Sequence, residues 1–274
     1  MSSDRRSLKL PPEMAVRLTI LGSGSAGNCA YLETESTRIL VDAGFSGKQI
    51  RERLAGIARS PETLHGILIT HEHSDHINGL TGLASKLRIP IYCNRLTKEA
   101  IEYTLKSTFE FRVFETGSRF EIGDLEVDAF SIPHDAQDPV GFMVRTPSGQ
   151  FGFLTDLGHA TKLALERVRN ANVLLLESNH DVKMLQEDTR RPWSTKQRIL
   201  GRHGHLSNEA AADVVDEILS DNLKHLFLGH LSRDCNRPEL AHKAVSDRLN
   251  RLGAAHIRVE LTSQFQANHT LSVG

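Results

Sequence analysis

His71-Glu72-His73-Ser74-Asp75-His76 is the stretch that decides the fold, because it gathers four possible metal ligands in one short segment. It follows the apolar run Gly66 to Ile69, which predicts a buried strand. At a strand end, the first two histidines can point to one side while the aspartate and the last histidine turn toward a neighbouring point. One loop could then serve two cations, and two such cations form a hydrolytic centre. A His-rich surface loop or a single-ion site is the alternative, which this density of ligands disfavours.

Further candidate ligands stand where other apolar segments end. These are His134, Asp156 and His230. Taken singly, a histidine is more often a satisfied core or surface residue, and a strand-end aspartate commonly caps a helix. Together they complete an imidazole and carboxylate set, which suits two divalent transition-metal ions, whether zinc, manganese or iron. The predicted ligands are His71, His73 and His134 for one ion, Asp75, His76 and His230 for the other, and Asp156 as the bridge.

Length and composition fit an ordinary soluble protein. The 274 residues are 39% hydrophobic and 24% charged, with a formal net charge of -1. This balance gives no global sign of a polyanionic partner, so a polyanion site would have to be local. Cys29, Cys93 and Cys235 are widely spaced and form no C-x-x-C pair, which indicates neither a disulfide framework nor a zinc ribbon. A reducing cytoplasm is the simpler interpretation.

The two ends of the domain follow from the same pattern. Residues 1–14 carry basic residues and two prolines but no apolar signal region, so they are interpreted as a flexible lead-in. No later stretch approaches a membrane-spanning length. Residues 15–274 contain no repeat, low-complexity tract or Pro/Gly-rich linker, which favours a single domain.

Strand-like and helix-like segments alternate along the chain, which predicts an α/β fold. A helix is expected at 77–87, because Ile77, Leu80, Ala84 and Leu87 would share one face. Turn signals at 122–124 and 147–149 predict antiparallel hairpins. Ser207 is expected to cap the helix that follows it. The remaining expected helices are 47–54, 208–219 and 239–252, and the expected strands are 16–21, 30–32, 39–41, 66–69, 111–114, 125–132, 140–145, 151–154, 173–177 and 225–228.

The ligand pattern resembles that of the metallo-β-lactamase-fold hydrolases. The resemblance rests on H-E-H-S-D-H at 71–76 followed in order by His134, Asp156 and His230, and it covers nearly the whole chain from about residue 16. Asp42 also matches an early strand-end aspartate, which has a structural role in that family. The resemblance implies a four-layer αβ/βα sandwich with the metals at one edge.

A narrower resemblance connects four segments to the YycJ/WalJ-type branch of this superfamily. They are Leu21 to Asn28, Leu176 to Asp181, Gly204 to Asn208, and Gly229 to Ser232. The first segment alone is weak, but all four in order are specific. The resemblance implies a small cytoplasmic protein that acts in DNA processing as a 5′-to-3′ exonuclease.

The expected chemistry is hydrolysis by a metal-bridging hydroxide. Asp75 is expected to orient the attacking water and accept its proton. His180 and His205 are the candidates for protonating the leaving group or contacting a phosphate. Their alternative roles are structural, with His205 ordering the turn before a helix and His180 capping the preceding strand.

Substrate contacts are expected in two places. Residues 189–205 carry a basic run in which Trp193 could stack on an unpaired base while Arg190, Arg191 and Arg198 follow the backbone. A solvated helix face, offset by Glu187 and Asp188, is the alternative. In the glycine-rich turn at 22–27, a nucleotide cofactor is disfavoured, because neither a P-loop nor a dinucleotide fingerprint fits. The candidates there for phosphate contact are Ser23, Ser25 and Asn28, with plain hairpin chemistry as the alternative.

The sequence therefore favours a dinuclear metal-dependent phosphodiesterase that acts on DNA and needs no membrane. A hydrolase of a small thioester or phosphodiester is an alternative, because fold and metals do not choose the substrate. A non-catalytic nucleic-acid-binding or regulatory protein is a further alternative, although degenerate members should lack ligands. The metal, DNA against RNA, strand polarity and oligomeric state stay open.

Overall fold

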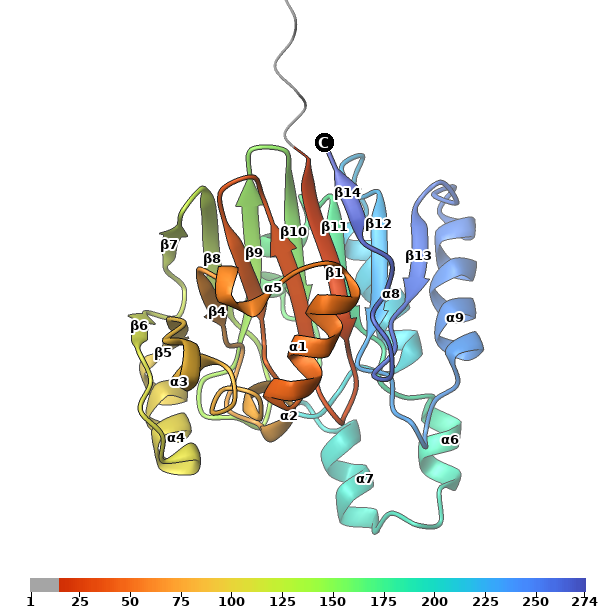
Figure 1. Cartoon of the computed structure of the whole chain (residues 1–274). Coiled ribbons are helices and arrows are strands. Elements are labelled where there is room, and N and C mark those ends of the chain that lie inside the picture. Colours follow the sequence, from red (N-terminus) through yellow and green to blue (C-terminus); the bar gives the residue numbers. More distant parts are fainter. Residues whose placement is uncertain (1–14) are drawn as a thin grey trace, which may run out of the picture.

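Two seven-stranded sheets pack face to face with helices on both outer faces, in the computed structural model, which describes residues 15–274 (Figure 1). The predicted four-layer αβ/βα sandwich is confirmed. The expected lead-in at 1–14 lies outside the described residues. No helix in the described part is both long and apolar enough to cross a membrane.

The first sheet is built from the N-terminal part of the chain and closed by its last strand. Its strands β3 to β6 run parallel, and β1 pairs antiparallel with both β2 and β14. In spatial order the strands are β14 (Leu271–Val273), β1 (Val16–Gly22), β2 (Cys29–Glu33), β3 (Arg38–Val41), β4 (Gly66–Leu68), β5 (Ile91–Asn94) and β6 (Phe111–Phe114). Its accompanying helices are α1 (Gly47–Gly56), the 3₁₀ turn η1 (Pro61–Thr63), α2 (Ser74–Ile77), α3 (Ala84–Leu87) and α4 (Arg95–Leu105).

The second sheet contains the two predicted hairpins. The turns at 122–124 and 147–149 join β7 to β8 and β9 to β10, while β10 to β13 run parallel. In spatial order the strands are β13 (Arg258–Leu261), β12 (His225–Gly229), β11 (Val173–Glu177), β10 (Gly149–Leu154), β9 (Val140–Thr146), β8 (Leu125–Ser131) and β7 (Arg119–Ile122). Its helices are α5 (Lys162–Val168), α8 (Asn208–Ile218) and α9 (Pro238–Arg251).

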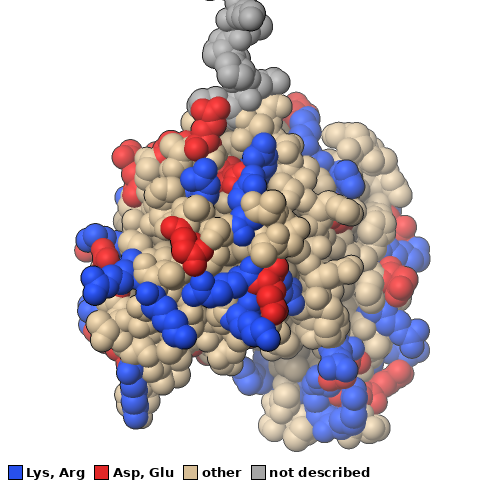
Figure 2. Space-filling view, in the orientation of Figure 1, with Lys and Arg blue, Asp and Glu red and all other residues tan. Residues whose placement is uncertain are grey.

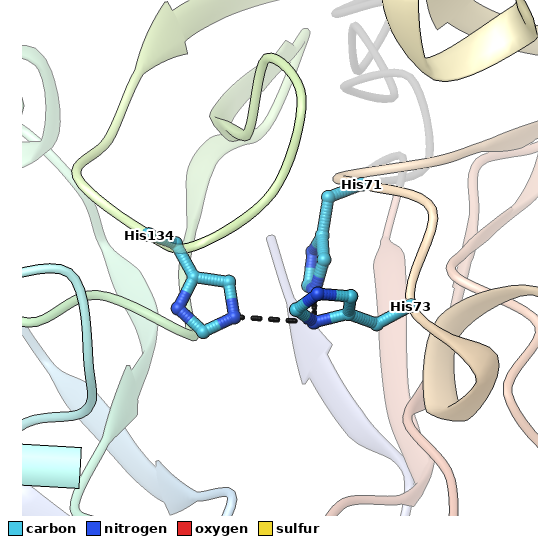
Figure 3. A group of neighbouring side chains, drawn as sticks. All are labelled: His71, His73 and His134. Carbon is cyan, nitrogen blue, oxygen red and sulfur yellow. Dashed lines mark hydrogen bonds between the residues drawn. The ribbon is translucent and has the colours of Figure 1, made fainter. Parts of the chain in front are cut away.

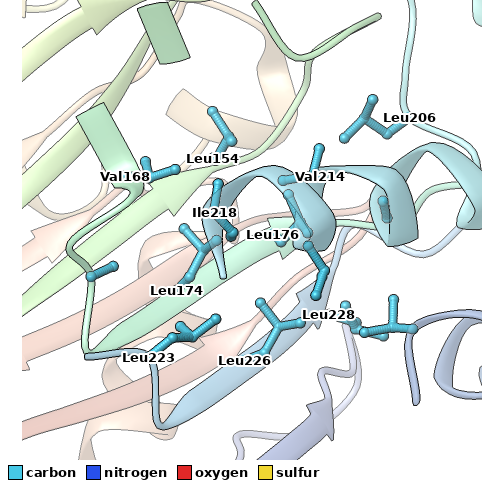
Figure 4. Packing of buried hydrophobic residues seen from close by; sticks show 14 of the residues in the cluster. Leu154, Val168, Leu174, Leu176, Leu206, Val214, Ile218, Leu223, Leu226 and Leu228 are labelled. Atoms are coloured by element: carbon cyan, nitrogen blue, oxygen red, sulfur yellow. The ribbon is translucent and has the colours of Figure 1, made fainter. Parts of the chain in front are cut away.

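Three buried apolar clusters hold the four layers together. The central cluster joins the inner faces of the sheets, with Leu18 and Ile20 of β1 in the same cluster as Phe142 of β9. A second cluster packs β10 to β12 against α5, α8 and α9 (Figure 4). The third packs β2 to β5 against α1 and α4. Alternate side chains of a strand point to opposite faces, so both sheets need apolar residues at nearly every position.

The expected helix at 77–87 is wrong. The chain instead forms α2 and α3 with a turn between them, although Ile77, Leu80 and Ala84 are buried as their spacing predicted. Gly79 lies against backbone, since a Cβ there would come within 2.4 Å of the Phe45 carbonyl oxygen. The glycines therefore bring this segment closer to the sheet than a regular helix could come.

The segments that follow β4, β8, β10 and β12 supply all seven predicted ligands, with Asp75 and His76 in the short helix α2. Ser207 caps α8 as predicted, its side chain accepting a hydrogen bond from the Ala210 N–H. Helices α6 (Val182–Glu187) and α7 (Trp193–Leu200) extend below the two sheets in Figure 1, on the side where α2 lies.

Candidate metal centre

Three histidines form the first ligand cluster. His71 and His73 come from the loop after β4, and His134 reaches them from the loop after β8 (Figure 3). The Nε2 atom of His71 lies 3.1 Å from Nδ1 of His73, and Nε2 of His134 lies 3.3 Å from the same Nδ1. Three ring nitrogens thus converge on one point, as a tetrahedral metal site with an open position requires.

The second cluster combines two carboxylates with two histidines. Asp75 and His76 lie in α2, directly after the loop that follows β4, whereas Asp156 and His230 follow β10 and β12. The Nε2 atom of His76 lies 3.3 Å from Oδ2 of Asp156, and Nε2 of His230 lies 3.4 Å from Oδ2 of Asp75. Within each cluster the ligand atoms are all within 4.8 Å of one another.

Asp156 carries the clearest sign that a cation fits here. Its side chain is 2% exposed, and its buried Oδ2 accepts no well-aligned hydrogen bond from the described residues, although Nε2 of His76 lies 3.3 Å away. A buried carboxylate oxygen without a hydrogen bond is costly, and a divalent cation between Asp156 and His76 would satisfy it. The donor set of imidazole and carboxylate likewise suits zinc, manganese or iron.

The backbone adopts an uncommon conformation at three strand ends around the clusters. Asp42, Asp156 and His230 have φ angles of 61°, 57° and 54°. Non-glycine residues rarely adopt this left-handed region, and such strain persists only where the surrounding structure holds it. The turns aim the Asp156 and His230 side chains back across the sheet edge toward the loop after β4.

Asp42 is a structural partner of the centre, as the resemblance implied. Its Oδ2 lies 2.8 Å from Nδ1 of His76, and its carboxylate also accepts hydrogen bonds from the N–H and hydroxyl of Thr70. A carboxylate on the far nitrogen fixes the ring orientation and tautomer of a metal-binding histidine. His76 Nε2 is therefore left to face the second cluster.

Glu177, which the sequence pattern did not single out, also lies at the centre, in a group with Asp156, His205 and His230. It ends β11, is fully buried, and its Oε1 lies 2.9 Å from Nδ1 of His230 and 2.7 Å from Nδ1 of His205. Its Oε2 accepts hydrogen bonds from the backbone N–H groups of Leu157 and Leu206. Its position at the end of an apolar strand was the available signal, the same signal that identified the ligands.

The protonation tendencies of the two clusters differ. Burial lowers the pKa of His71 well below its usual value, which leaves a neutral imidazole suited to a metal. Burial acts in the same direction on His76 and His230, but neighbouring carboxylates outweigh it and raise the pKa of both well above the usual value. The second cluster thus concentrates negative charge, and a cation there would take the place of protons.

Ser23 and Asn28 lie at the centre, where they hold candidate ligands in place. The hydroxyl of Ser23 donates to Oδ1 of Asn28 and accepts from the N–H of His230, each at 2.8 Å. Nδ2 of Asn28 lies 3.1 Å from Nε2 of His76. Ser25 is exposed on the same turn. The Ser23 hydroxyl is thus engaged on both sides, and its predicted contact with phosphate stays a prediction.

The two predicted proton donors occupy different surroundings. His205 is partly exposed beside the second cluster, and burial is outweighed by Glu177, which raises its pKa. His180 is 1% exposed, belongs to neither cluster, and neither of its ring nitrogens has a hydrogen-bond partner in the described chain. Burial lowers its pKa to about 4. The geometry therefore places His205 beside the second cluster and leaves His180 buried outside both ligand clusters.

The three arginines that were predicted to contact the substrate form ion pairs within the protein. Arg190 and Arg191 form ion pairs with both Asp188 and Asp234, and Arg198 pairs with Asp135 beside His134. Trp193 begins α7 with 61% of its surface exposed. Figure 2 shows basic and acidic side chains intermingled over α6 and α7. The charge of this region is thus more balanced than a basic run suggests.

Comparison with known proteins connects this geometry to a family. The beta-lactamase superfamily domain matches residues 37–230. The chain is 42% identical over 241 residues to exodeoxyribonuclease WalJ of Streptococcus pneumoniae serotype 2, covering 86% of this chain and 89% of that protein. It is 39% identical over 242 residues to exodeoxyribonuclease YycJ of Bacillus anthracis, covering 88% and 91%. The metallo-β-lactamase-fold protein YhfI of Bacillus subtilis superposes with a TM-score of 0.70 over 94% of this chain and 99% of that one, at 16% identity.

Proposed function

The chain belongs to the β-lactamase superfamily, and on that premise we propose that it is a metal-dependent exodeoxyribonuclease that degrades DNA from the 5′ end. The observation that carries the proposal is the pair of ligand clusters, the second of which contains Asp156, in a chain about 40% identical to two exodeoxyribonucleases over most of its length. Two divalent cations held there would supply a nucleophile from water at neutral pH and neutralise charge on a phosphodiester.

Asp75 is the residue we assign to proton acceptance from the attacking water. Its side chain is 20% exposed, whereas those of His76, Asp156 and His230 are at most 3% exposed. Asp75 is therefore the member of its cluster that solvent and substrate can reach. One of its oxygens faces His230, which leaves the other free to orient a water.

His205 is the residue we assign to protonation of the leaving oxygen. Its side chain is 17% exposed, and Glu177 holds Nδ1 at 2.7 Å, so Nε2 is the nitrogen available to substrate. Because Glu177 raises the pKa of His205, the imidazolium needed for proton donation is favoured near neutral pH. His180 is proposed to support the turn behind it.

DNA contacts are proposed along α7, the turn at 22–28 and the arginines that pair with local aspartates. Trp193 is exposed for stacking on an unpaired base. DNA phosphates would compete with Asp188, Asp234 and Asp135 for Arg190, Arg191 and Arg198. Zinc, manganese or iron fits the donors, and the three buried free cysteines are in keeping with work in the cytoplasm.

The deciding experiment uses DNA labelled at the 5′ or the 3′ end and protein loaded with manganese or zinc. We expect metal-dependent release of the 5′ label as single nucleotides, with the 3′ label retained in shortening strands. Asp156→Asn should abolish release, whereas Asp221→Asn, at an exposed turn, should not. Metal-loaded protein that leaves DNA intact but hydrolyses a thioester or a small phosphodiester would overturn the proposal.

A further inference from the structure

A small pocket adjoins the candidate metal centre on the His230 side. Its volume is about 260 Å³, close to the lower end of the range for small-molecule sites, so it suits one nucleotide rather than a longer segment. Its lining includes Ser23, whose hydroxyl accepts from the N–H of His230, and Leu231, the next residue along the chain. The pocket therefore adjoins the metal centre through Ser23 and through the residue that follows His230.

One wall of the pocket presents an aromatic ring to solvent. Phe265 lines it with 72% of its surface exposed. The loop that carries this ring is held to the glycine-rich turn, since the Ser23 N–H donates to Ser263 O and the Ala26 N–H donates to Oε1 of Gln264. Arg53 also donates to the carbonyl of Gln264 at 2.7 Å. An exposed aromatic ring on a loop that is fixed in place is a platform for base stacking.

The pocket lining also includes an arginine that has no partner among the described residues. Arg233 lines the pocket and forms no ion pair or side-chain hydrogen bond with the described residues. Its neighbour Asp234 is already engaged by Arg190 and Arg191, at 3.2 and 2.9 Å. The loop is anchored by Asn236, whose Nδ2 donates to two carbonyls at the end of β11. Arg233 therefore offers an unneutralised charge from a fixed loop, which is the requirement for binding a phosphate.

We propose that this pocket binds the 5′-terminal nucleotide of the DNA strand, with Phe265 stacking on its base and Arg233 pairing with its 5′-phosphate. The inference rests on the proposed exonuclease function and specifies which end of the strand the site recognises. The nearby groove beside His134, lined by Pro133, Leu163 and His203, is larger, about 450 Å³, and would take the continuing strand. The groove includes His134 of the first ligand cluster, whereas the pocket includes Ser23 and Leu231, which contact or adjoin His230 of the second.

Each cleavage produces a new 5′-phosphate that Arg233 can bind before the next cleavage. Water adds its oxygen to the scissile phosphorus, the bond from phosphorus to the 3′ oxygen of the first nucleotide breaks, and that oxygen takes up a proton. The released nucleotide keeps its own 5′-phosphate, and the shortened strand gains a new one. A strand that begins with a 5′-hydroxyl should therefore be cut slowly once and then at the full rate.

The test compares 5′-phosphorylated and 5′-hydroxyl oligonucleotides of one sequence on metal-loaded protein. We expect the first cut of the 5′-hydroxyl strand to be about tenfold slower or more, with later cuts unaffected. Arg233→Ala should slow every cut of both strands to the rate of that first step. Phe265→Ala should raise KM about tenfold for both. Arg169 directly follows α5, Tyr103 lies in α4, and both side chains are exposed. Arg169→Ala and Tyr103→Ala are therefore matched controls, which should change neither the rate of any cut nor KM.

A binding measurement separates this inference from the function on which it rests. Deoxyadenosine monophosphate should bind metal-loaded wild-type protein more tightly than deoxyadenosine, and Arg233→Ala should remove most of the difference while metal content is unchanged. Equal phosphate preference in wild type and Arg233→Ala, with DNA degradation intact, would overturn the pocket assignment alone. Absence of DNA degradation together with absence of nucleotide binding would overturn both.

Discussion

Glu177 joins a candidate metal ligand to the candidate proton donor through one carboxylate. Replacement by Gln removes the charge that raises the pKa of His205, so the imidazolium should be lost at a lower pH. We expect kcat on DNA to fall about 10- to 100-fold and its alkaline limb to move to lower pH, with KM nearly unchanged. A pH profile of kcat for Glu177→Gln beside wild type checks this. An unshifted alkaline limb would assign Glu177 to structure alone.

Glu33 at the end of β2 is predicted to make the free energy of unfolding depend on pH in the acidic range. Burial alone would raise its pKa, but hydrogen bonds from Arg59, Tyr31 and Arg17 outweigh it and lower the pKa to about 2. A depressed pKa gives stability that is complete above the unfolded value near 4.5 and is lost as pH falls toward 2. Glu33→Gln should therefore lower the free energy of unfolding by about 2 to 3 kcal/mol at pH 7. Urea titrations should show this difference shrinking between pH 4.5 and pH 2.5; a difference independent of pH would contradict it.

At the scale of elements, the connection between β3 and α1 supports the loop after β4 and the short helix α2, which together carry four candidate ligands. Gly44 lies so close to Asp75 that an added Cβ would come within 1.6 Å of the Asp75 carbonyl oxygen. Gly44→Ala should displace this loop, lower metal affinity at least about tenfold and destabilise the fold by about 2 kcal/mol or more. Metal titration and thermal unfolding measure the two effects.

The control for Gly44→Ala is Gly56→Ala at the end of α1. A Cβ at Gly56 would meet nothing within 4 Å, so this change should leave metal affinity intact and alter stability only slightly. Metal affinity in Gly44→Ala as high as in Gly56→Ala would mean that the loop after β4 tolerates displacement.

The sequence predicted elements better than it predicted contacts between them. Strand ends gave all seven candidate ligands, because a buried apolar run followed by a polar residue is a local pattern. The predicted helix at 77–87 was wrong because Gly79 and Gly82 lie close to the backbone of Phe45 and Gly47. The spacing of apolar residues gives no information about such a contact. The pairing of Arg198 with Asp135 joins residues 63 positions apart, so a local charge count could not anticipate it. Glu177 was missed because its partners are two distant histidines.

At the scale of the whole molecule, both ligand clusters join the two sheets. Each takes residues from the loop after β4 in the first sheet and from loops of the second sheet. Bound metal should therefore stabilise the sandwich, since a ligand that binds only the folded state adds its binding free energy. We expect removal of metal by a chelator to lower Tm by about 5 to 15 °C. The chelator should lower the Tm of Asp156→Asn by less. An equal fall in Tm for both proteins would contradict a stabilising role for metal bound at this centre.

The strand order also determines when this centre can exist during synthesis. The first sheet's ligands are synthesised before the others, yet the second cluster needs Asp156 and then His230, and β1 gains its partner β14 only once residues 271–273 have been made. A nascent or truncated chain that stops before residue 230 therefore carries an incomplete centre. The topology therefore delays hydrolytic activity until the chain has been synthesised past residue 230 and the two sheets have packed against each other.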